Sequence, residues 1–201
     1  MNMLSDGDML NLPYKIVLAS NSPRRKELLR GLGVDFTIRT IDGIDESWPE
    51  ELTGQEIPIY ISSQKADSYA SSMTPEELVI TADTIVYLDN RVYGKPRNAE
   101  EAKRMLRELS GKWHEVITGV TIVTKDKRKS FAVTTEVKFA YFSDDEISYY
   151  VRNYSPMDKA GAYGIQEWIG FIGVEQIKGA YFNVVGLPVQ RLYKELKDFA
   201  F

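Results

Sequence analysis

Hydrophobic and polar residues alternate along this chain with two different periods. In residues 131–142, apolar side chains alternate with more polar ones, which is the period of a strand with one buried face. In residues 102–109, apolar side chains recur at positions i, i+3, i+4 and i+7, which places them on one face of a helix. The chain is therefore expected to contain both strands and amphipathic helices.

Strands are predicted where apolar runs are bounded by polar turns. The run from residue 78 to residue 88 is nearly continuous, as expected of a buried strand. Asp89 and Asn90 turn it back into a short strand at residues 91–93. The remaining predicted strands cover residues 14–19, 116–124 and 131–142.

Helices are predicted where capping residues precede an apolar face. Ser22 and Pro23 favour a helix start, and Gly33 favours its end. Asn98 and Ser143 are further cap residues, each followed three residues later by a glutamate. Helices are expected at residues 23–33, 58–70, 99–109, 144–153 and 188–199, with glycine-rich loops and short strands at 158–187. This mixture predicts an α/β or α+β fold.

Length and composition indicate an ordinary globular protein. The 201 residues suit one domain, or one fold with two lobes around a cleft. No segment approaches the roughly 18 consecutive apolar residues of a membrane span. Residues 1–12 carry no lysine or arginine, unlike a signal peptide, and we interpret them as an extension of a domain at residues 13–201. Because neither the basic start nor the apolar run of a signal peptide is present, we expect a cytoplasmic protein, and the absence of cysteine agrees with this.

Charge argues against a nucleic-acid partner. The formal net charge is −4, whereas nucleic-acid binders usually present a basic face. One basic run, at residues 125–129, lies between two predicted strands and is typical of a solvated hairpin tip. We therefore expect neither a nucleic-acid nor a membrane partner.

A candidate phosphate site lies in residues 18–25, LASNSPRR. Arg24 and Arg25 fall in the first turn of a predicted helix, where the helix dipole disfavours each cation by roughly 0.3–1 kcal/mol. The free backbone N–H groups at that end favour an anion, and guanidinium groups bind phosphate oxygens in pairs. The pattern indicates a phosphate site, and the alternative is two surface arginines paired with Glu27 or solvent.

Candidate catalytic residues lie in the central strand and in the hairpin after it. Asp83 interrupts a buried strand, where a carboxylate is costly unless it is paired or binds a metal. It is either a catalytic or metal-binding group, or a structural aspartate satisfied by a lysine or backbone amides. Thr84 faces the other side if the strand is regular. Gly94 and Pro96 shape the loop of Lys95, which is either a binding residue or an exposed loop lysine.

Five further residues are ambiguous when each is taken alone. Lys65 lies at the edge of an apolar helix face, from which a lysine more often extends into solvent. Asp45 and Glu46 lie in a polar loop, which is more often solvated than a ligand. Gln166 follows a glycine-rich stretch, and its amide can pair with a nucleobase edge. His114, the one histidine, is interpreted as structural.

Several familiar catalytic motifs are absent from the sequence. There is no GxxxxGK[ST] phosphate loop, no GxGxxG after a strand, no HExxH zinc motif and no cysteine for thiol catalysis. The sequence offers carboxylates, arginines and lysines instead. These residues suit Mg²⁺-type ions, phosphate groups and the activation of water.

Nine segments occur in the order typical of one family, and they are spread over nearly the whole chain from residue 16. They are LASNSPRRKELL (18–29), the Asp45-Glu46 loop, Lys65-Ala66, TADTIV (81–86), GKPRNAEEAKRML (94–106), LSGKWHEVITGV (109–120), TTEVKF (134–139), DKAGAYGIQ (158–166) and GAYFNVVGLP (179–188). The chain therefore resembles the Maf family, which is named for a link to septum formation.

The resemblance implies a fold related to the inosine triphosphate pyrophosphatases, with an elongated mixed sheet, flanking helices and a cleft between two lobes. It implies hydrolysis of a nucleoside triphosphate to the monophosphate and pyrophosphate, dependent on a divalent metal (Mg²⁺ or Mn²⁺), by a homodimer. A nucleotide-binding regulator of septum formation with little turnover is the main alternative. A phosphotransferase is disfavoured because no phosphate loop or acceptor-site motif is visible.

The resemblance also assigns roles to individual residues. Asp83 is the expected proton acceptor, and Glu46 is the expected second carboxylate near the metal. The expected phosphate-binding residues are Ser20, Arg24, Arg25, Lys65 and Lys95. The residues at the three positions that influence base choice, Arg24, Thr84 and Gln166, resemble the branch that prefers dTTP and UTP, in ordinary or modified form.

Overall fold

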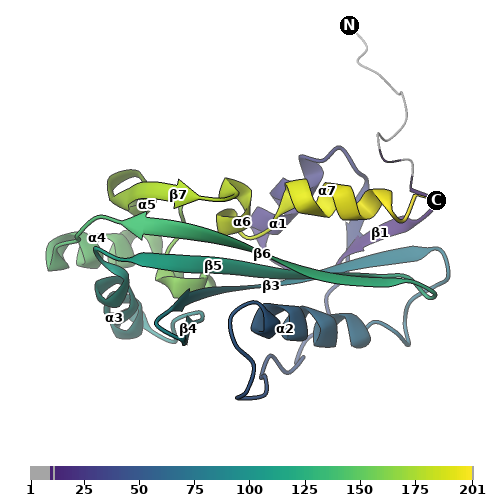
Figure 1. Cartoon of the computed structure of the whole chain (residues 1–201), viewed down its shortest axis with the longest axis horizontal. Helices are drawn as coiled ribbons and strands as arrows, with labels where there is room; N and C mark the ends of the chain where they lie inside the picture. The colour runs from purple at the N-terminus through teal and green to yellow at the C-terminus, as the bar shows by residue number, and fades with distance from the viewer. Residues whose placement is uncertain (1–9, 11, 201) are drawn as a thin grey trace, which may run out of the picture.

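Three long strands run through the centre of the elongated molecule (Figure 1). In the computed structural model, which describes residue 10 and residues 12–200, they are β3 (Glu77–Leu88), β5 (Trp113–Val123) and β6 (Arg128–Phe139). Strand β5 pairs antiparallel with both β3 and β6. In β3, Ala82 and Val86 are buried on either side of Asp83 and Thr84, so this strand carries polar groups into the interior.

Four shorter strands complete a mixed sheet. Strand β1 (Lys15–Leu18) lies parallel to both β2 (Phe36–Ile38) and β3. Strand β7 (Val174–Lys178) pairs antiparallel with β6 at the other edge. The strand order is β2-β1-β3-β5-β6-β7, and β4 (Arg91–Tyr93) pairs with the end of β3.

Helices cover both faces of the sheet (Figure 1). Helix α2 (Glu56–Asp67) lies against one face, on β3 and β5. The opposite face carries α1 (Pro23–Arg30), α6 (Tyr181–Val185) and α7 (Val189–Lys197). Among the described residues, no helix is long and apolar enough to span a lipid bilayer.

The remaining helices gather at one end of the long strands. Helices α3 (Ala99–Leu109) and α4 (Asp144–Tyr154) pack against each other, and α5 (Trp168–Gly173) leads directly into β7. Two 3₁₀ turns, η1 (Pro156–Asp158) and η2 (Ala160–Ala162), connect α4 to this region. Asn98 and Ser143 cap α3 and α4 as predicted, and Ser143 forms the expected capping box with Glu146.

Two large hydrophobic clusters divide the molecule into two lobes. One cluster includes Leu78, Ile80 and Ala82 of β3, and the other includes Val86 and Leu88 of the same strand. Asp83 and Thr84 lie along β3 between the residues of the two clusters, at the junction of the two lobes. The predicted α/β architecture, with an elongated mixed sheet, flanking helices and two lobes, is therefore confirmed.

Some predicted boundaries were wrong. The first helix ends at Arg30 rather than at Gly33, because the N–H groups of Leu32 and Gly33 bond only three residues back, to Leu29 and Arg30, and Gly33 has a positive φ of 71°. The second helix is shifted to Glu56–Asp67, and the strand pair begins earlier, at Trp113 and Arg128.

The glycine-rich region 158–187 was also predicted incorrectly, and one strand was missed. The region contains two short helices, one complete 3₁₀ turn and a single strand. These elements were not predicted because segments of three to six residues show no readable periodicity. Strand β2 was missed for the same reason, since it has only three residues.

Most of the predicted N-terminal extension, residues 1–9 and 11, lies outside the described residues. Leu10 is 4% exposed and belongs to the cluster under α1 and α7, and Leu12 packs against that cluster. The packed part of the chain thus includes these two leucines, and the division into an extension at residues 1–12 and a domain at 13–201 stays a prediction.

Candidate active site

A cleft of about 460 Å³ opens at the junction of the two lobes. Its floor is formed by β3 at Asp83 and Thr84, and its walls come from the loop after β1, the start of α1, the loop before α2, and η1 with the segment that follows it. Every site residue predicted from the sequence lines this cleft: Ser20, Arg24, Arg25, Glu46, Lys65, Asp83, Thr84, Lys95 and Gln166.

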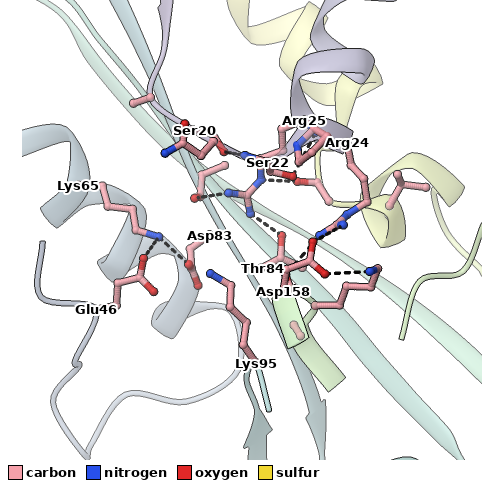
Figure 2. Close-up of a pocket in the computed structure, with 18 of the residues that line it drawn as sticks. Ser20, Ser22, Arg24, Arg25, Glu46, Lys65, Asp83, Thr84, Lys95 and Asp158 are labelled. Carbon is pink, nitrogen blue, oxygen red and sulfur yellow. Dashed lines mark hydrogen bonds and ion pairs between the residues drawn. The ribbon is translucent and has the colours of Figure 1, made fainter. Parts of the chain in front are cut away.

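Lys65 lies between two carboxylates on one side of the cleft (Figure 2). Its Nζ is 2.8 Å from Asp83 Oδ1 and 2.8 Å from Glu46 Oε1. The side chains of Lys65 and Asp83 are only 13% and 14% exposed. Lys65 thus does not extend into solvent, the commoner outcome for such a lysine taken alone, because α2 packs on the face of β3 from which Asp83 points.

Charge at this side of the cleft favours ionised carboxylates. Burial by itself would raise the pKa of Glu46, but the hydrogen bond and charge of Lys65, with the charges of Lys95 and Arg25, bring that pKa below its ordinary value. Asp45, the neighbour of Glu46, instead bonds to Ser47 and is exposed. Glu46 is thus the member of the acidic pair that reaches the cleft.

Arg25 joins three segments across the opposite side. Its Nε donates to Gly186 O at 2.9 Å, Nη1 to Ala82 O at 2.9 Å and Nη2 to Thr84 Oγ1 at 3.0 Å. Burial lowers the pKa of this guanidinium, although Asp83 and Glu46 oppose the effect. Because the guanidinium has five N–H donors, two remain for a ligand in the cleft.

Two serine side chains shape the start of α1. The Ser22 side chain accepts a hydrogen bond from the Arg25 N–H, and Ser20 Oγ accepts one from the Ser22 N–H at 3.2 Å. Pro23 occupies the first turn, and no acidic residue does. The two serines therefore hold the loop in place. Because Pro23 has no N–H and the N–H groups of Arg25 and Lys26 are already bonded to Ser22, the helix start leaves few backbone donors for an anion.

Arg24 points away from Arg25, toward the η1 turn (Figure 2). Its Nη1 lies 2.8 Å from Asp158 Oδ2, and Nη2 donates to the backbone oxygen of Asp158 at 3.3 Å. Asp158 also accepts from Lys159 Nζ at 2.8 Å, and Lys159 continues to Glu167 at 3.1 Å. Burial would raise the pKa of Asp158, but Lys159 and Arg24 together lower it to about 2.

The family profile described as "Maf-like protein" matches residues 15–199 of this chain. The chain belongs to the Maf-like family.

Named relatives of this Maf-like chain match it over most of its length. It is 62% identical over 184 residues to the dTTP/UTP pyrophosphatase of Phocaeicola vulgatus, covering 92% of this chain and 95% of the relative. It is 60% identical over 185 residues to the dTTP/UTP pyrophosphatase of Bacteroides fragilis strain YCH46, covering 92% and 96%. The resemblance stated from the sequence motifs is therefore confirmed at the level of the family.

Among solved structures, the Maf-like fold is similar to the Ham1 protein of Staphylococcus aureus, with a TM-score of 0.50 and 19% identity. The similarity covers 90% of this chain and 99% of the other. At this identity the similarity concerns the fold alone.

Two of the residues predicted to influence base choice in this Maf-like chain, Thr84 and Gln166, differ in the hydrogen bonds of their polar atoms. Thr84 Oγ1 accepts from Arg25 and lies 2.9 Å from Thr118 Oγ1, so its hydroxyl is already engaged. Gln166 Oε1 is buried and has no hydrogen-bond partner among the described residues. Thr84 and Asp83 point to opposite faces of β3, as its regularity predicted, since Asp83 meets α2 and Thr84 meets α1.

Sequence reasoning missed two cleft residues. Asp158 and Lys159 were noted only as part of the DKAGAYGIQ segment, yet both line the cleft. Asp158 bonds to Arg24, and Lys159 bonds to Asp158. The signal available in the sequence was the adjacent acid–base pair just before a glycine-rich segment. His114 is 3% exposed, bonds to the Tyr163 hydroxyl at 2.8 Å and does not line the cleft, which fits a structural residue.

The two carboxylates of the cleft, Glu46 and Asp83, supply some of the oxygen ligands that a hard divalent cation needs. Oxygens of Glu46 and Asp83 converge on the point where Lys65 Nζ lies, and carboxylate oxygens are ligands that Mg²⁺ and Mn²⁺ accept. Among the described residues, no group of three or more acidic, histidine or cysteine side chains could hold a metal. The two carboxylates thus leave coordination positions for water and substrate oxygens.

Proposed function

We propose that this chain hydrolyses dTTP and UTP to the nucleoside monophosphate and pyrophosphate. The observation that carries the proposal is the contact of Lys65 with both Asp83 and Glu46, across a cleft from Arg24 and Arg25. The printed names of the relatives and the family membership support the same reaction and the same bases.

Charge balance supports a triphosphate ligand. Such a substrate carries about four negative charges, and the cleft offers four cationic side chains that could oppose them. These are Arg24, Arg25, Lys65 and Lys95. A divalent cation held by Glu46 and Asp83 would add Lewis-acid stabilisation of the phosphate charge.

The proposed chemical step is one direct displacement. A water oxygen forms a bond to the α-phosphorus, and the bond from that phosphorus to the bridging α–β oxygen breaks. Asp83 takes the proton of the water, and its Oδ2 has no hydrogen-bond partner among the described residues, so this oxygen is free to accept it. Pyrophosphate leaves with the electron pair of the broken bond, and the lysines and arginines stabilise the charge that develops on it.

Base selectivity is proposed to rest on Gln166. Its unpartnered Oε1 can accept the N3–H of uracil or thymine, while its amide N–H groups can donate to a ring carbonyl. A base with another edge would leave this buried acceptor unpaired, which is costly. Thr84 would act through Arg25, because its hydroxyl is already engaged.

A product analysis tests the reaction. Purified protein with Mg²⁺ or Mn²⁺ is given dTTP, UTP, dCTP, dATP and GTP, and pyrophosphate is resolved from orthophosphate. Monophosphate and pyrophosphate, formed fastest from dTTP and UTP, are expected. Asp83→Asn should lower turnover by roughly 10²–10⁴-fold, the usual contribution of a positioned base.

The matched control is Asp42→Asn, which removes one negative charge from the rim of the same cleft. It should change turnover far less than Asp83→Asn does. Nucleotide binding without turnover in the wild-type protein would favour the alternative, a nucleotide-binding regulator of septum formation, over the enzyme. Equal rates on all five nucleotides would overturn the base assignment alone.

We further propose that the protein acts as a cytoplasmic homodimer that binds neither nucleic acid nor membranes. The family resemblance supports the dimer, and the net charge of −4 supports the absence of a nucleic-acid partner. Light scattering coupled to gel filtration measures the mass directly, and a particle of 22.9 kDa would contradict the dimer.

A further inference from the structure

Lys65 lies between the two carboxylates that would hold a divalent cation. Its Nζ is 2.8 Å from Glu46 Oε1 and 2.8 Å from Asp83 Oδ1, and its side chain is 13% exposed (Figure 2). A Mg²⁺–oxygen bond is about 2.1 Å long, so such an ion fills the space between the oxygens that it shares. An ammonium group and a divalent ion cannot both occupy that point.

We propose that Lys65 is an internal counter-cation, which holds Glu46 and Asp83 together in the nucleotide-free protein and leaves them for the phosphates when substrate and metal arrive. The inference rests on the proposed function, since it takes the nucleotide and the metal from there. It assigns to Lys65 two alternating sets of partners, carboxylates before binding and phosphate oxygens after it.

The side chain of Lys65 is suited to such an exchange. Its ammonium group has three donors on a flexible stem of four carbons, so it can change partners by rotation of the side chain alone. Arg25 is different, because three of its donors are committed to Gly186, Ala82 and Thr84. Lys95 is exposed and has no ion pair among the described residues, although its charge acts on Glu46.

The exchange has a consequence for the order of binding. A free divalent ion must displace Lys65 and gains only two carboxylates in return. An ion that arrives on a triphosphate brings phosphate oxygens that accept the displaced ammonium group. The nucleotide-free protein should therefore bind free metal weakly, and the metal site should become complete only with the substrate.

The test is a titration of nucleotide-free protein with Mn²⁺, in which the electron paramagnetic resonance signal reports the free ion. Lys65→Met should bind Mn²⁺ at least about tenfold more tightly than wild type, because a competing positive charge is gone from the site. Lys65→Gln should show a gain of the same sign, and it keeps the measurement decisive if the Met variant does not fold. Adding Asp83→Asn to Lys65→Met should abolish the gain in Mn²⁺ affinity, which would show that the ion binds at Asp83.

The matched control is Lys95→Met, which removes a cleft lysine that does not contact the carboxylates. It should alter Mn²⁺ affinity less than about threefold, as expected for a more distant and screened charge. The proposal is overturned if wild type already binds free Mn²⁺ as tightly as Lys65→Met, or if neither Lys65 variant gains affinity. Failure of wild type to hydrolyse dTTP would overturn the proposed function instead, and this is measured separately with Mn²⁺ and dTTP.

Discussion

Gly119 lies directly beside Asp83 in the sheet, under the first turn of α2. The two residues are register partners in β5 and β3, and both face the helix. A Cβ built on Gly119 would lie 2.2 Å from the backbone carbon and oxygen of Pro58 and 2.5 Å from the nitrogen of Ile59. Replacement of Gly119 by alanine therefore pushes the helix backbone, which cannot rotate out of the way as a side chain can.

The size of the effect follows from this geometry. To reach ordinary contact at about 3.4 Å, the start of α2 must move by roughly 1 Å. Lys65 lies seven residues further along the same helix, about two turns. Overpacking of this kind costs about 1–3 kcal/mol of unfolding free energy, which lowers Tm by roughly 2–10 °C at this chain length. A displacement of about 1 Å in a positioning residue can cost on the order of 10²-fold in turnover.

Differential scanning calorimetry and a pyrophosphate-release assay with dTTP measure the two effects on Gly119→Ala. Gly94→Ala is the control for stability, because a Cβ at Gly94 has nothing within 4 Å and its φ is not positive. Its Tm should stay within a few degrees of wild type. An unchanged Tm in Gly119→Ala would refute the steric reasoning. A lowered Tm with unchanged turnover would show that the position of α2 does not control Lys65.

Three further substitutions test separate parts of the structure. Burial lowers the pKa of His114 from 6.5 to about 3, so the ring stays neutral in the folded protein at pH values where it is protonated in the unfolded chain. The contribution of His114 to the free energy of unfolding is therefore fully present above pH 6.5 and is lost as the pH falls toward 3. In urea titrations, lowering the pH from 7.5 to 5 should reduce the unfolding free energy of wild type by about 2 kcal/mol more than that of His114→Leu. Equal reductions would contradict the lowered pKa of His114. Asp158→Asn removes the negative charge that holds Arg24. The ratio of kcat/KM for dTTP to kcat/KM for dCTP should then fall by roughly tenfold, which corresponds to the free energy of one charge-assisted hydrogen bond. Rates that fall equally for both nucleotides would assign Asp158 to general structure. Gln166→Leu should lower kcat/KM for UTP by at least about tenfold while inhibition by free pyrophosphate stays unchanged, and weaker pyrophosphate binding would place Gln166 at the phosphates instead.

The prediction of the helices and strands succeeded where the local signal was strong. Asn98 and Ser143 cap helices as expected, and the Asp89-Asn90 turn has the positive φ angles, 51° and 58°, of a tight hairpin. Helices α5 and α6 were missed because six and five residues are too few for a period to appear. These short helices are held in place by packing rather than by their own propensity.

For the candidate site, the sequence by itself indicated which side chains are functional candidates and on which strand, helix or loop each one lies. A carboxylate in a buried strand, two arginines at a helix start and a lysine on a shaped loop could all be recognised without coordinates, because each conflicts with the local pattern around it. The tertiary structure alone decided which groups meet. Lys65 and Asp83 are 18 positions apart, and Arg24 and Asp158 are 134 positions apart. Contacts at such separations leave no periodic trace in a sequence, since they depend on how α2 and η1 pack against the two lobes.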